Sequence, residues 1–273
     1  MRIGLGTYAL AWSIGVPGHS PKQPMDIYSF LNFANTHGFR LVQIADNLPL
    51  LQLGNDELEK IYKVARALDI AIELGTRGLT LSNVEQHLAI ARLLHADLLR
   101  IVIDKADYQP DMNTIHATIK ALVPLLEACH IRLAIENHDR LKASDFSKII
   151  EQANSALVGI CLDSVNSLGA DEGFASVFEV LAPHTINLHL KDYTIHRKSH
   201  MMGFDVTGTP AGEGMLPIRE VVKVLEFHGK CQSMILELWP APEPAFEDTV
   251  AKEQRWVEQS ARYLFHNFKN TTL

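Results

Sequence analysis

The chain has 273 residues, of which 47% are hydrophobic and 21% charged, and its formal net charge is −7 at pH 7. This length is typical of one barrel of alternating strands and helices, and the apolar share supplies a large core, which excludes a disordered or low-complexity chain. The acidic balance argues against a nucleic-acid-binding surface, which needs clustered lysine and arginine. It favours a small-molecule partner.

Cysteine usage and the amino terminus indicate the compartment. Cys129, Cys161 and Cys231 are far apart and form no CxxC pair, which is typical of reduced thiols. The amino terminus enters a strand-like run at once, without the apolar region of a signal peptide, and no apolar run approaches the roughly 18 residues of a membrane span. We therefore expect a cytoplasmic protein that has no membrane partner.

Short strand-like runs alternate eight times with longer stretches of helical periodicity. The predicted strands are Arg2–Tyr8, Arg40–Asp46, Ile70–Gly75, Leu98–Asp104, Ile131–Glu136, Leu157–Asp163, Thr185–Lys191 and Ser233–Leu238. The predicted helices are Asp26–His37, Asp56–Leu68, Val84–His95, Asn113–Ala128, Asp145–Asn154, Phe174–Leu181, Ile218–Phe227 and Phe246–Phe268. Eight βα units without a linker or a composition break predict an α/β fold, a single (β/α)₈ TIM barrel, with residues 1–273 in one domain.

Two predicted connections exceed the usual two to six residues or so. They are Ala9–Met25 after the first strand and Asp192–Pro217 after the seventh. Both follow strands, so they lie at the carboxyl-terminal face of the barrel, where barrel enzymes have their active sites. We interpret them as candidate walls or lids of a site, with solvated insertions as the alternative.

The alternation of apolar residues predicts which side of each strand points into the barrel. The apolar sets expected to pack on the helices are Ile70, Ile72 and Leu74; Val158, Ile160 and Leu162; Ile186, Leu188 and Leu190; and Met234, Leu236 and Leu238. The opposite parity directs another set toward the barrel axis: Glu73, Arg100, Asp104, Ala134, Glu136, Cys161, Asp163, Asn187, His189, Lys191 and Glu237.

Four of these inward residues are at or near the ends of four consecutive strands: Glu136, Asp163, His189 and Glu237. Neighbouring strands are about 4.8 Å apart, so three carboxylates and an imidazole converge, and a shared divalent cation relieves their repulsion. Oxygen-rich ligation with one nitrogen favours Mn²⁺, Mg²⁺ or Co²⁺ and also accommodates Zn²⁺. Each residue alone is more often a helix cap or half of an ion pair, but the four together favour one metal site.

The motifs at these strand ends resemble those of the xylose isomerase-like TIM barrel superfamily, which includes sugar isomerases and ketose 3-epimerases. The resemblance extends over essentially the whole chain and rests on Ala134-Ile135-Glu136-Asn137-His138, Ile160-Cys161-Leu162-Asp163-Ser164, Leu188-His189-Leu190-Lys191-Asp192, Ala211-Gly212-Glu213-Gly214 and Leu236-Glu237-Leu238-Trp239. It implies that the four residues hold one divalent metal ion. It also implies that Glu136 and Glu237 form the catalytic acid/base pair.

Asn166 departs from the family pattern, because many members have a histidine three residues after the aspartate of the sixth strand. The usual epimerase substrate contact at this point is therefore changed. A repair nuclease is disfavoured, since endonuclease IV needs additional histidines to hold three zinc ions.

Several further residues are candidates for substrate binding, namely Trp12, Glu73, His138, Asn166, Lys191 and Arg197. Lys191 and the loop residue Arg197 offer positive charge to a carboxylate or phosphate, with a solvated basic loop as the alternative. Trp12 offers an aromatic face to the carbon skeleton of a sugar, with rim packing as the alternative. Glu73 and Arg100 point inward on adjacent strands, and an internal ion pair is the favoured interpretation for Arg100.

The leading prediction is a divalent-metal-dependent sugar isomerase or epimerase. It would act on a hydroxy-ketone or hydroxy-aldehyde sugar, or a sugar acid, through an enediolate held by the metal ion. The alternative is a metal-dependent decarboxylase (a lyase) of a 3-oxo sugar acid, resembling 3-oxo-isoapionate decarboxylase, because loss of CO₂ passes through a similar enolate. The basic seventh loop and Asn166 suit that alternative. A dehydratase of the dehydroshikimate type and a non-catalytic sugar-binding protein rank lower.

The substrate, the metal and the oligomeric state are left open by the sequence. Barrels of this size commonly associate, and the apolar tail segment Tyr263-Leu264-Phe265 is a candidate contact in a homo-oligomer.

Overall fold

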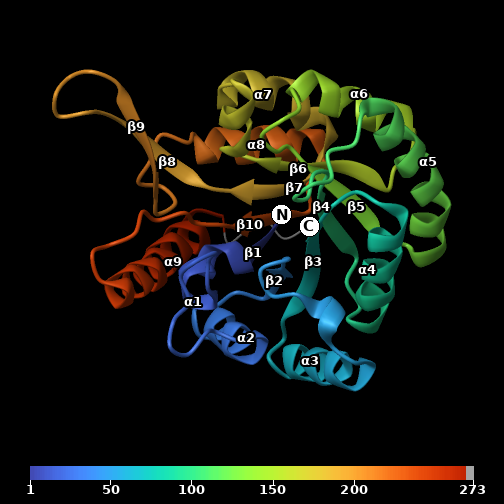
Figure 1. Cartoon of the computed structure of the whole chain (residues 1–273), viewed down its shortest axis with the longest axis horizontal. Helices are drawn as coiled ribbons and strands as arrows, with labels where there is room; N and C mark the ends of the chain where they lie inside the picture. Colours follow the sequence, from blue (N-terminus) through green and yellow to red (C-terminus); the bar gives the residue numbers. More distant parts are fainter. Residues whose placement is uncertain (269–273) are drawn as a thin grey trace.

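Eight parallel strands close into a barrel in the computed structural model, which describes residues 1–268 (Figure 1). Around the barrel the order is β1-β10-β7-β6-β5-β4-β3-β2. The strands are β1 (Arg2–Gly6), β2 (Leu41–Ile44), β3 (Ala71–Arg77), β4 (Leu98–Val102), β5 (Arg132–Glu136), β6 (Val158–Asp163), β7 (Thr185–Leu190) and β10 (Ser233–Leu236). The predicted (β/α)₈ TIM barrel is confirmed.

Helices surround the barrel, and each predicted helix is found at or within a few residues of its predicted ends. They are α1 (Ala11–Ile14), α2 (Ile27–Thr36), α3 (Asn55–Ala67), α4 (Leu81–Leu93), α5 (Met112–Cys129), α6 (Ala143–Ala153), α7 (Phe174–Leu181), α8 (Ile218–His228) and α9 (Phe246–Phe268). Side-chain caps set several starts: Asp26, Thr80 and Asp111 each accept the backbone N–H three residues ahead, at 2.8, 3.2 and 2.8 Å.

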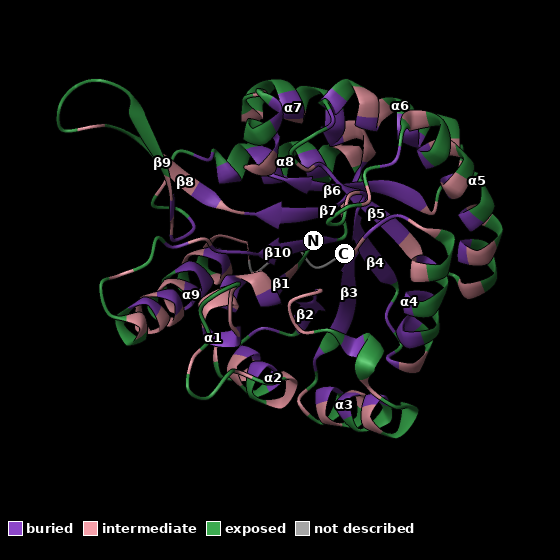
Figure 2. Ribbon diagram, in the orientation of Figure 1, coloured by how far each residue is buried: buried purple, intermediate pink, exposed green. Residues whose placement is uncertain are grey.

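Buried residues fill the space between the strands and the helices, while the outer helix faces are exposed (Figure 2). A second, smaller apolar cluster consists of Leu98, Ala134, Cys161 and Ile186. Ile186 was predicted to face the helices, and this was wrong. The register between β6 and β7 shifts at Ile160 and Cys161, so Ile186 is the unpaired residue, and its side chain packs over Gly159.

Asp104 was also predicted to point toward the barrel axis, and the structure corrects this. Strand β4 ends at Val102, so strand parity no longer governs Asp104. Its carboxylate instead accepts two bonds from the Arg140 guanidinium, at 2.6 and 2.8 Å.

The two long connections differ in structure. The first contains a 3₁₀ turn, η1 (Thr7–Leu10), followed by α1. The second forms an antiparallel hairpin of β8 (Asp192–Arg197) and β9 (Phe204–Thr209) that projects from the barrel (Figure 1). The Asp192 carboxylate fixes the base of this hairpin by accepting the backbone N–H groups of Gly212, Gly214 and Leu216. A Cβ at Gly214 would lie 2.1 Å from Asp192 Oδ1, which explains the Ala211–Gly214 motif.

The apolar tail segment is used within the chain itself. Leu264 is buried in the core, and the ring of Phe265 packs on Phe39 with centroids 5.2 Å apart. Across residues 1–268, no helix combines the length and the hydropathy that crossing a membrane requires. Cys129, Cys161 and Cys231 are free thiols.

Candidate metal centre and active site

The four predicted ligands meet at the carboxyl-terminal end of the barrel. Glu136 ends β5, Asp163 ends β6, His189 is in β7 and Glu237 follows β10. All four are at most 3% exposed. His189 Nδ1 lies 3.3 Å from Glu237 Oε1 and 3.6 Å from Glu136 Oε2. Ligand atoms of Asp163, His189 and Glu237 all lie within 4.8 Å of one another.

One buried atom of each of these residues has no hydrogen-bond partner among residues 1–268. These atoms are Glu136 Oε2, Asp163 Oδ2, His189 Nδ1 and Glu237 Oε1. Glu136 Oε2 and Asp163 Oδ2 face cations, whereas His189 Nδ1 and Glu237 Oε1 lie 3.3 Å from each other. A buried polar atom left unsatisfied costs about 1–3 kcal/mol, so a ligand that satisfies these atoms stabilises the site. Three carboxylate oxygens and one imidazole nitrogen are a donor set that fits one divalent metal ion.

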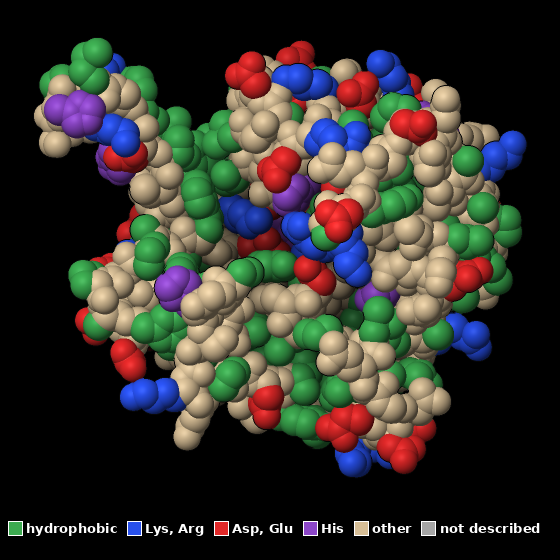
Figure 3. Space-filling view, in the orientation of Figure 1, with side chains coloured by type: hydrophobic (Ala, Val, Ile, Leu, Met, Phe, Trp, Pro, Cys, Tyr) green, Lys and Arg blue, Asp and Glu red, His purple; other side chains and the backbone are tan. Residues whose placement is uncertain are grey.

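Two buried cations face the same carboxylates. Figure 3 shows blue and red side chains gathered around the central hollow of this face. Lys191 Nζ lies 2.8 Å from Asp163 Oδ2 and 3.0 Å from Glu237 Oε2. Arg100 Nε lies 2.9 Å from Glu136 Oε2. The predicted pairing of Arg100 with Glu73 was therefore wrong. In the strand register Arg100 is opposite Ala134, next to the strand position of Glu136.

These charges shift the acid–base behaviour of the site. Burial lowers the pKa of Lys191, but the carboxylates of Asp163 and Glu237 outweigh burial, and the pKa is raised. Burial raises the pKa of Glu237, but His189 and Lys191 outweigh it and hold the pKa well below its usual range. The contacts therefore favour the charged forms of Lys191 and Glu237 in this arrangement.

Hydrogen bonds hold the remaining ligand oxygens in place. Asn166 Nδ2 donates to Glu136 Oε1 at 2.7 Å, so the residue that replaces the usual histidine bonds directly to a predicted ligand. Asp163 Oδ1 accepts the backbone N–H groups of Val165 and Asn166, both at 2.8 Å. Asn137 bonds to the backbone of Asp163 on both sides, at 2.7 and 3.0 Å. The free oxygens of Glu136 and Asp163 are thereby turned toward the shared centre.

Gln43 is a site residue that the sequence analysis missed. Its Oε1 lies 2.7 Å from His189 Nε2, the ring nitrogen that faces away from the predicted ligands. Gln43 is the one polar residue of β2, Leu41–Ile44, and this interruption of an apolar strand is the signal that could have found it.

Glu73 lies deeper in the barrel than the four predicted ligands and is not part of their cluster. It is 0% exposed, and its partners are Gln43 at 3.2 Å, Asn187 at 3.3 Å and Arg2 at 3.4 Å. Burial raises the pKa of Glu73. The interior of the barrel closes over this carboxyl group, so the predicted substrate contact is corrected.

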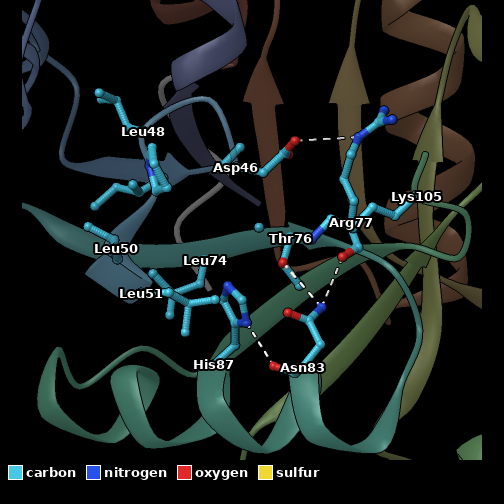
Figure 4. A pocket seen from close by; sticks show the side chains of 14 residues that line it. Asp46, Leu48, Leu50, Leu51, Leu74, Thr76, Arg77, Asn83, His87 and Lys105 are labelled. Carbon is cyan, nitrogen blue, oxygen red and sulfur yellow. Dashed lines mark hydrogen bonds and ion pairs between the residues drawn. The ribbon is translucent and has the colours of Figure 1, made fainter. Parts of the chain in front are cut away.

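His138 follows Glu136 by two residues, and a neighbouring pocket connects to the ligand cluster through Asp46, which lies 3.8 Å from Arg100. His138 Nε2 is 3.0 Å from Arg77, whose Nε lies 3.5 Å from Asp46 (Figure 4). The pocket beside Arg77 has a volume of about 230 Å³. Its apolar wall consists of Leu48, Leu50, Leu51 and Leu74, and its polar lining residues are Asp46, Arg77, Asn83, His87 and Lys105. It offers room for a small organic group next to the cluster of charges.

A second pocket, of about 470 Å³, opens directly above the predicted ligands. It is lined by Asp139, Val165, Asn166, Leu168, Gly169, Lys191, Val206 and Trp239. Lys191 and Asn166 thus connect the ligand cluster to this opening. Val206 belongs to the hairpin, so the hairpin forms one wall of the opening, in agreement with the expectation for the seventh connection.

Two predicted substrate contacts lie away from the ligand cluster. Trp12 Nε1 donates to the Pro240 carbonyl at 3.1 Å, and its ring packs edge-on against His19 and Phe246 at the rim. Arg197 is exposed on the projecting hairpin, where its guanidinium lies 4.3 Å from the centre of the Phe204 ring. Within residues 1–268, neither side chain forms a hydrogen bond or an ion pair with a predicted ligand.

Comparison with known proteins agrees with the strand-end motifs. Residues 14–264 match the family model described as xylose isomerase-like TIM barrel. The chain belongs to this family. Among curated relatives, this xylose isomerase-like barrel is 30% identical to the 3-oxo-isoapionate decarboxylase of Pectobacterium atrosepticum, over 97% of this chain and 95% of that one. The family and this relative indicate a sugar-modifying enzyme.

Solved structures share the fold of this xylose isomerase-like chain at low identity. D-psicose 3-epimerase, solved in the presence of D-fructose, superposes with a TM-score of 0.71 at 15% identity, covering 97% of this chain and 99% of that one. A xylose isomerase-like TIM barrel protein from Mycobacterium smegmatis, in complex with magnesium, gives a TM-score of 0.68 at 14% identity and 96% coverage of both chains.

Proposed function

We propose that this protein is a divalent-metal-dependent decarboxylase of a 3-oxo sugar acid. The observation that carries the proposal is the charge of the ligand cluster. The carboxylates of Glu136, Asp163 and Glu237 face the cations of Arg100 and Lys191, so the formal sum of the five groups is −1. A divalent ion changes that sum to +1.

A buried site with a charge of +1 favours an anionic ligand, because an uncompensated buried charge is costly. A neutral ketose leaves that charge unbalanced, whereas the carboxylate of a sugar acid neutralises it. The 30% identity to 3-oxo-isoapionate decarboxylase over almost the whole of both chains supports the same choice. We therefore place decarboxylation ahead of isomerisation, the reverse of the order that the sequence suggested.

In the proposed reaction, the bond between the carboxylate carbon and the neighbouring carbon breaks and CO₂ leaves. The electron pair of that bond moves into the substrate to form an enolate of the 3-oxo group, and the neighbouring carbon then takes up a proton. A bound divalent ion would act as a Lewis acid toward the negative oxygen of the enolate. Glu136, Asp163, His189 and Glu237 would hold the ion.

The other side chains have separate roles in this proposal. Lys191 lies at the opening of the site and orients the substrate carboxylate through its ammonium group. Asn166 holds Glu136 Oε1 at 2.7 Å, beside that opening. The proton taken up by the substrate carbon comes from solvent, and we assign its relay to Glu136, whose Oε1 is held beside the opening by Asn166.

Isomerisation or epimerisation of a hydroxy-ketone sugar is the second candidate. The observation that favours it is the placement of two carboxylates around one imidazole, Glu136 at 3.6 Å and Glu237 at 3.3 Å from His189 Nδ1. Such a pair can remove a proton and return it. The fold shared with D-psicose 3-epimerase is consistent with this candidate.

One experiment separates the two candidates. Purified protein is loaded with Mn²⁺ and incubated in D₂O with 3-oxo sugar acids labelled with ¹³C at the carboxylate and, separately, with neutral ketoses. Release of labelled CO₂ is expected, and Glu136→Gln should abolish it while Glu127→Gln, an exposed glutamate on α5, should not. Deuterium exchange into ketoses without CO₂ release would favour isomerisation. Neither activity in the metal-loaded protein would refute both.

A further inference from the structure

Below the ligand cluster, a buried network of polar side chains extends into the barrel. It consists of His189, Gln43, Glu73, Asn187 and Ser233, each at most 1% exposed. Its members come from four barrel strands, β2, β3, β7 and β10. The reaction proposed above uses none of them except His189, so a polar network at this depth needs another explanation.

The network fixes the orientation of the Gln43 amide. Gln43 Nε2 donates to Glu73 Oε2 at 3.2 Å and to Asn187 Oδ1 at 3.3 Å. Asn187 Nδ2 also donates to Glu73 Oε2, at 3.3 Å, and to Ser233 Oγ at 2.8 Å. Glu73 Oε2 accepts both bonds whether or not Oε1 carries a proton. A flipped Gln43 amide would place Oε1 against Glu73 Oε2, two acceptors at hydrogen-bond distance in a buried site.

The orientation of Gln43 in turn decides the tautomer of His189. With Gln43 Oε1 at 2.7 Å, His189 Nε2 must carry a proton to form a hydrogen bond. A proton on the other nitrogen, Nδ1, points toward Glu237 Oε1 at 3.3 Å, and Glu136 Oε2 lies 3.6 Å away. A divalent ion placed between these atoms takes the place of that proton, and the Nδ1 lone pair then faces the ion.

We propose that Gln43 and Glu73 are positioning residues for the metal centre: Glu73 orients the Gln43 amide, and Gln43 holds His189 in the tautomer that presents Nδ1 to a divalent ion. This inference rests on the metal dependence in the proposed function. Glu73, first expected to touch the substrate, acts through Gln43 and His189 and touches neither substrate nor metal.

The experiment measures Zn²⁺ affinity by competition with a chromophoric chelator. Gln43→Leu and Glu73→Leu should each weaken Zn²⁺ binding about 10- to 100-fold, the usual effect of removing the partner of a ligating histidine or its support. Glu73→Gln keeps an acceptor oxygen for Gln43 and Asn187 and should bind within about threefold of wild type. Thr185→Val is the matched control and should bind as wild type, because Thr185 is buried in β7 and bonds to the Leu181 carbonyl, outside the network.

A variant in which the side chains of positions 43 and 73 are exchanged tests whether their hydrogen bonds, and not only their packing, are required. The double variant Gln43→Glu with Glu73→Gln keeps the atom count and net charge, and its new carboxylate accepts from both His189 Nε2–H and the new amide. It should recover most of the lost affinity. In the zinc-loaded wild type, the His189 Nε2 proton should also exchange slowly with solvent in ¹H–¹⁵N spectra, and quickly in Gln43→Leu.

Each outcome has a defined meaning. Binding within about threefold of wild type in Glu73→Leu overturns the inference, as does a loss in both leucine variants that the exchanged pair does not recover. Should Gln43→Leu fail to fold, Glu73→Leu and the exchanged pair still decide. Absence of Zn²⁺ and Mn²⁺ binding by the wild type would instead contradict the metal dependence in the proposed function.

Discussion

Lys191 occupies the position of a counter-ion in the ligand cluster, and replacing it by methionine has opposite effects in the metal-free and metal-loaded protein. Lys191 is 15% exposed at its side chain, and its partners Asp163 and Glu237 are almost fully buried. Removing one partner of a buried ion pair costs about 3–5 kcal/mol, because the remaining charges lose their compensation. Metal-free Lys191→Met should therefore be about 3 kcal/mol less stable than wild type.

A bound divalent ion compensates the same two carboxylates. Saturating Mn²⁺ should therefore reduce the stability difference between Lys191→Met and wild type to about 1 kcal/mol or less. In the wild type the ion must displace the ammonium from Asp163 Oδ2, a step that the variant does not require. We expect the variant to bind Mn²⁺ about 30-fold more tightly, which corresponds to the difference of about 2 kcal/mol between the two conditions.

Thermal unfolding with chelator and with excess Mn²⁺ measures both effects. At about 2 °C per kcal/mol for a chain of this size, metal-free Lys191→Met should melt roughly 6 °C below wild type and gain more from Mn²⁺. Lys198→Met is the control, since Lys198 pairs with Asp205 on the exposed hairpin. A metal-free Lys191→Met that melts with wild type, or that gains less from Mn²⁺, would refute the counter-ion role.

Two further substitutions test the catalytic site and the barrel interior. Asn166→Ala removes the N–H that holds Glu136 Oε1 at 2.7 Å and should lower kcat for CO₂ release at least tenfold with Zn²⁺ affinity within threefold of wild type; equal kcat would contradict the proposed role. Gly159→Ala places a Cβ 2.6 Å from Ile186 Cγ2 and 3.0 Å from the His184 carbonyl, so urea unfolding should show a loss of about 1–3 kcal/mol. Ile186→Ala removes the contacting γ carbons and should therefore cost less stability in this variant than in the wild type.

The fold could be predicted from the sequence because each βα unit carries its own local signals. Helices Phe174–Leu181 and Phe246–Phe268 were predicted to the residue, and the strand ends at Glu136 and Asp163 were also correct. The alternation of side chains along a strand gave a wrong orientation where the alignment with the neighbouring strand determines it. Because the register between β6 and β7 shifts, the side chain of Ile186 points into the barrel. The alternation of residues within β7 alone could not have shown this orientation.

In the candidate site, too, some features could be read from single strands and others depend on how neighbouring strands are aligned. Strand parity brought Glu136, Asp163 and His189 to one point, because the end of each strand and its inward face can both be read locally. The partners of these residues depend on the stagger between strands, which places Arg100 against Glu136 and Glu73 beside Gln43. The sequence therefore predicts which residues face inward, while the register determines which of them meet.

Glu253 makes a pH-dependent contribution to stability that is independent of the metal centre. It is a buried residue of α9, and its carboxyl group accepts the N–H groups of Trp12 and Ser13 at 2.8 and 2.9 Å and the Ser13 hydroxyl at 2.8 Å. Burial raises its pKa from 4.5 to about 7, although these bonds oppose the rise. Between those two values the folded chain binds a proton that the unfolded chain does not.

The folded pKa is the higher one, so the stability due to Glu253 is fully present below pH 4.5 and is lost as the pH rises through about 7. From about pH 5.5 to about pH 8 the loss is about 2 kcal/mol. Glu253→Gln cannot titrate, so the free energy of unfolding of wild type minus that of the variant should fall by this amount over the same interval. Urea unfolding at the two pH values measures the difference. A constant difference would mean that the three donors keep the carboxylate charged throughout, and that burial does not dominate its titration.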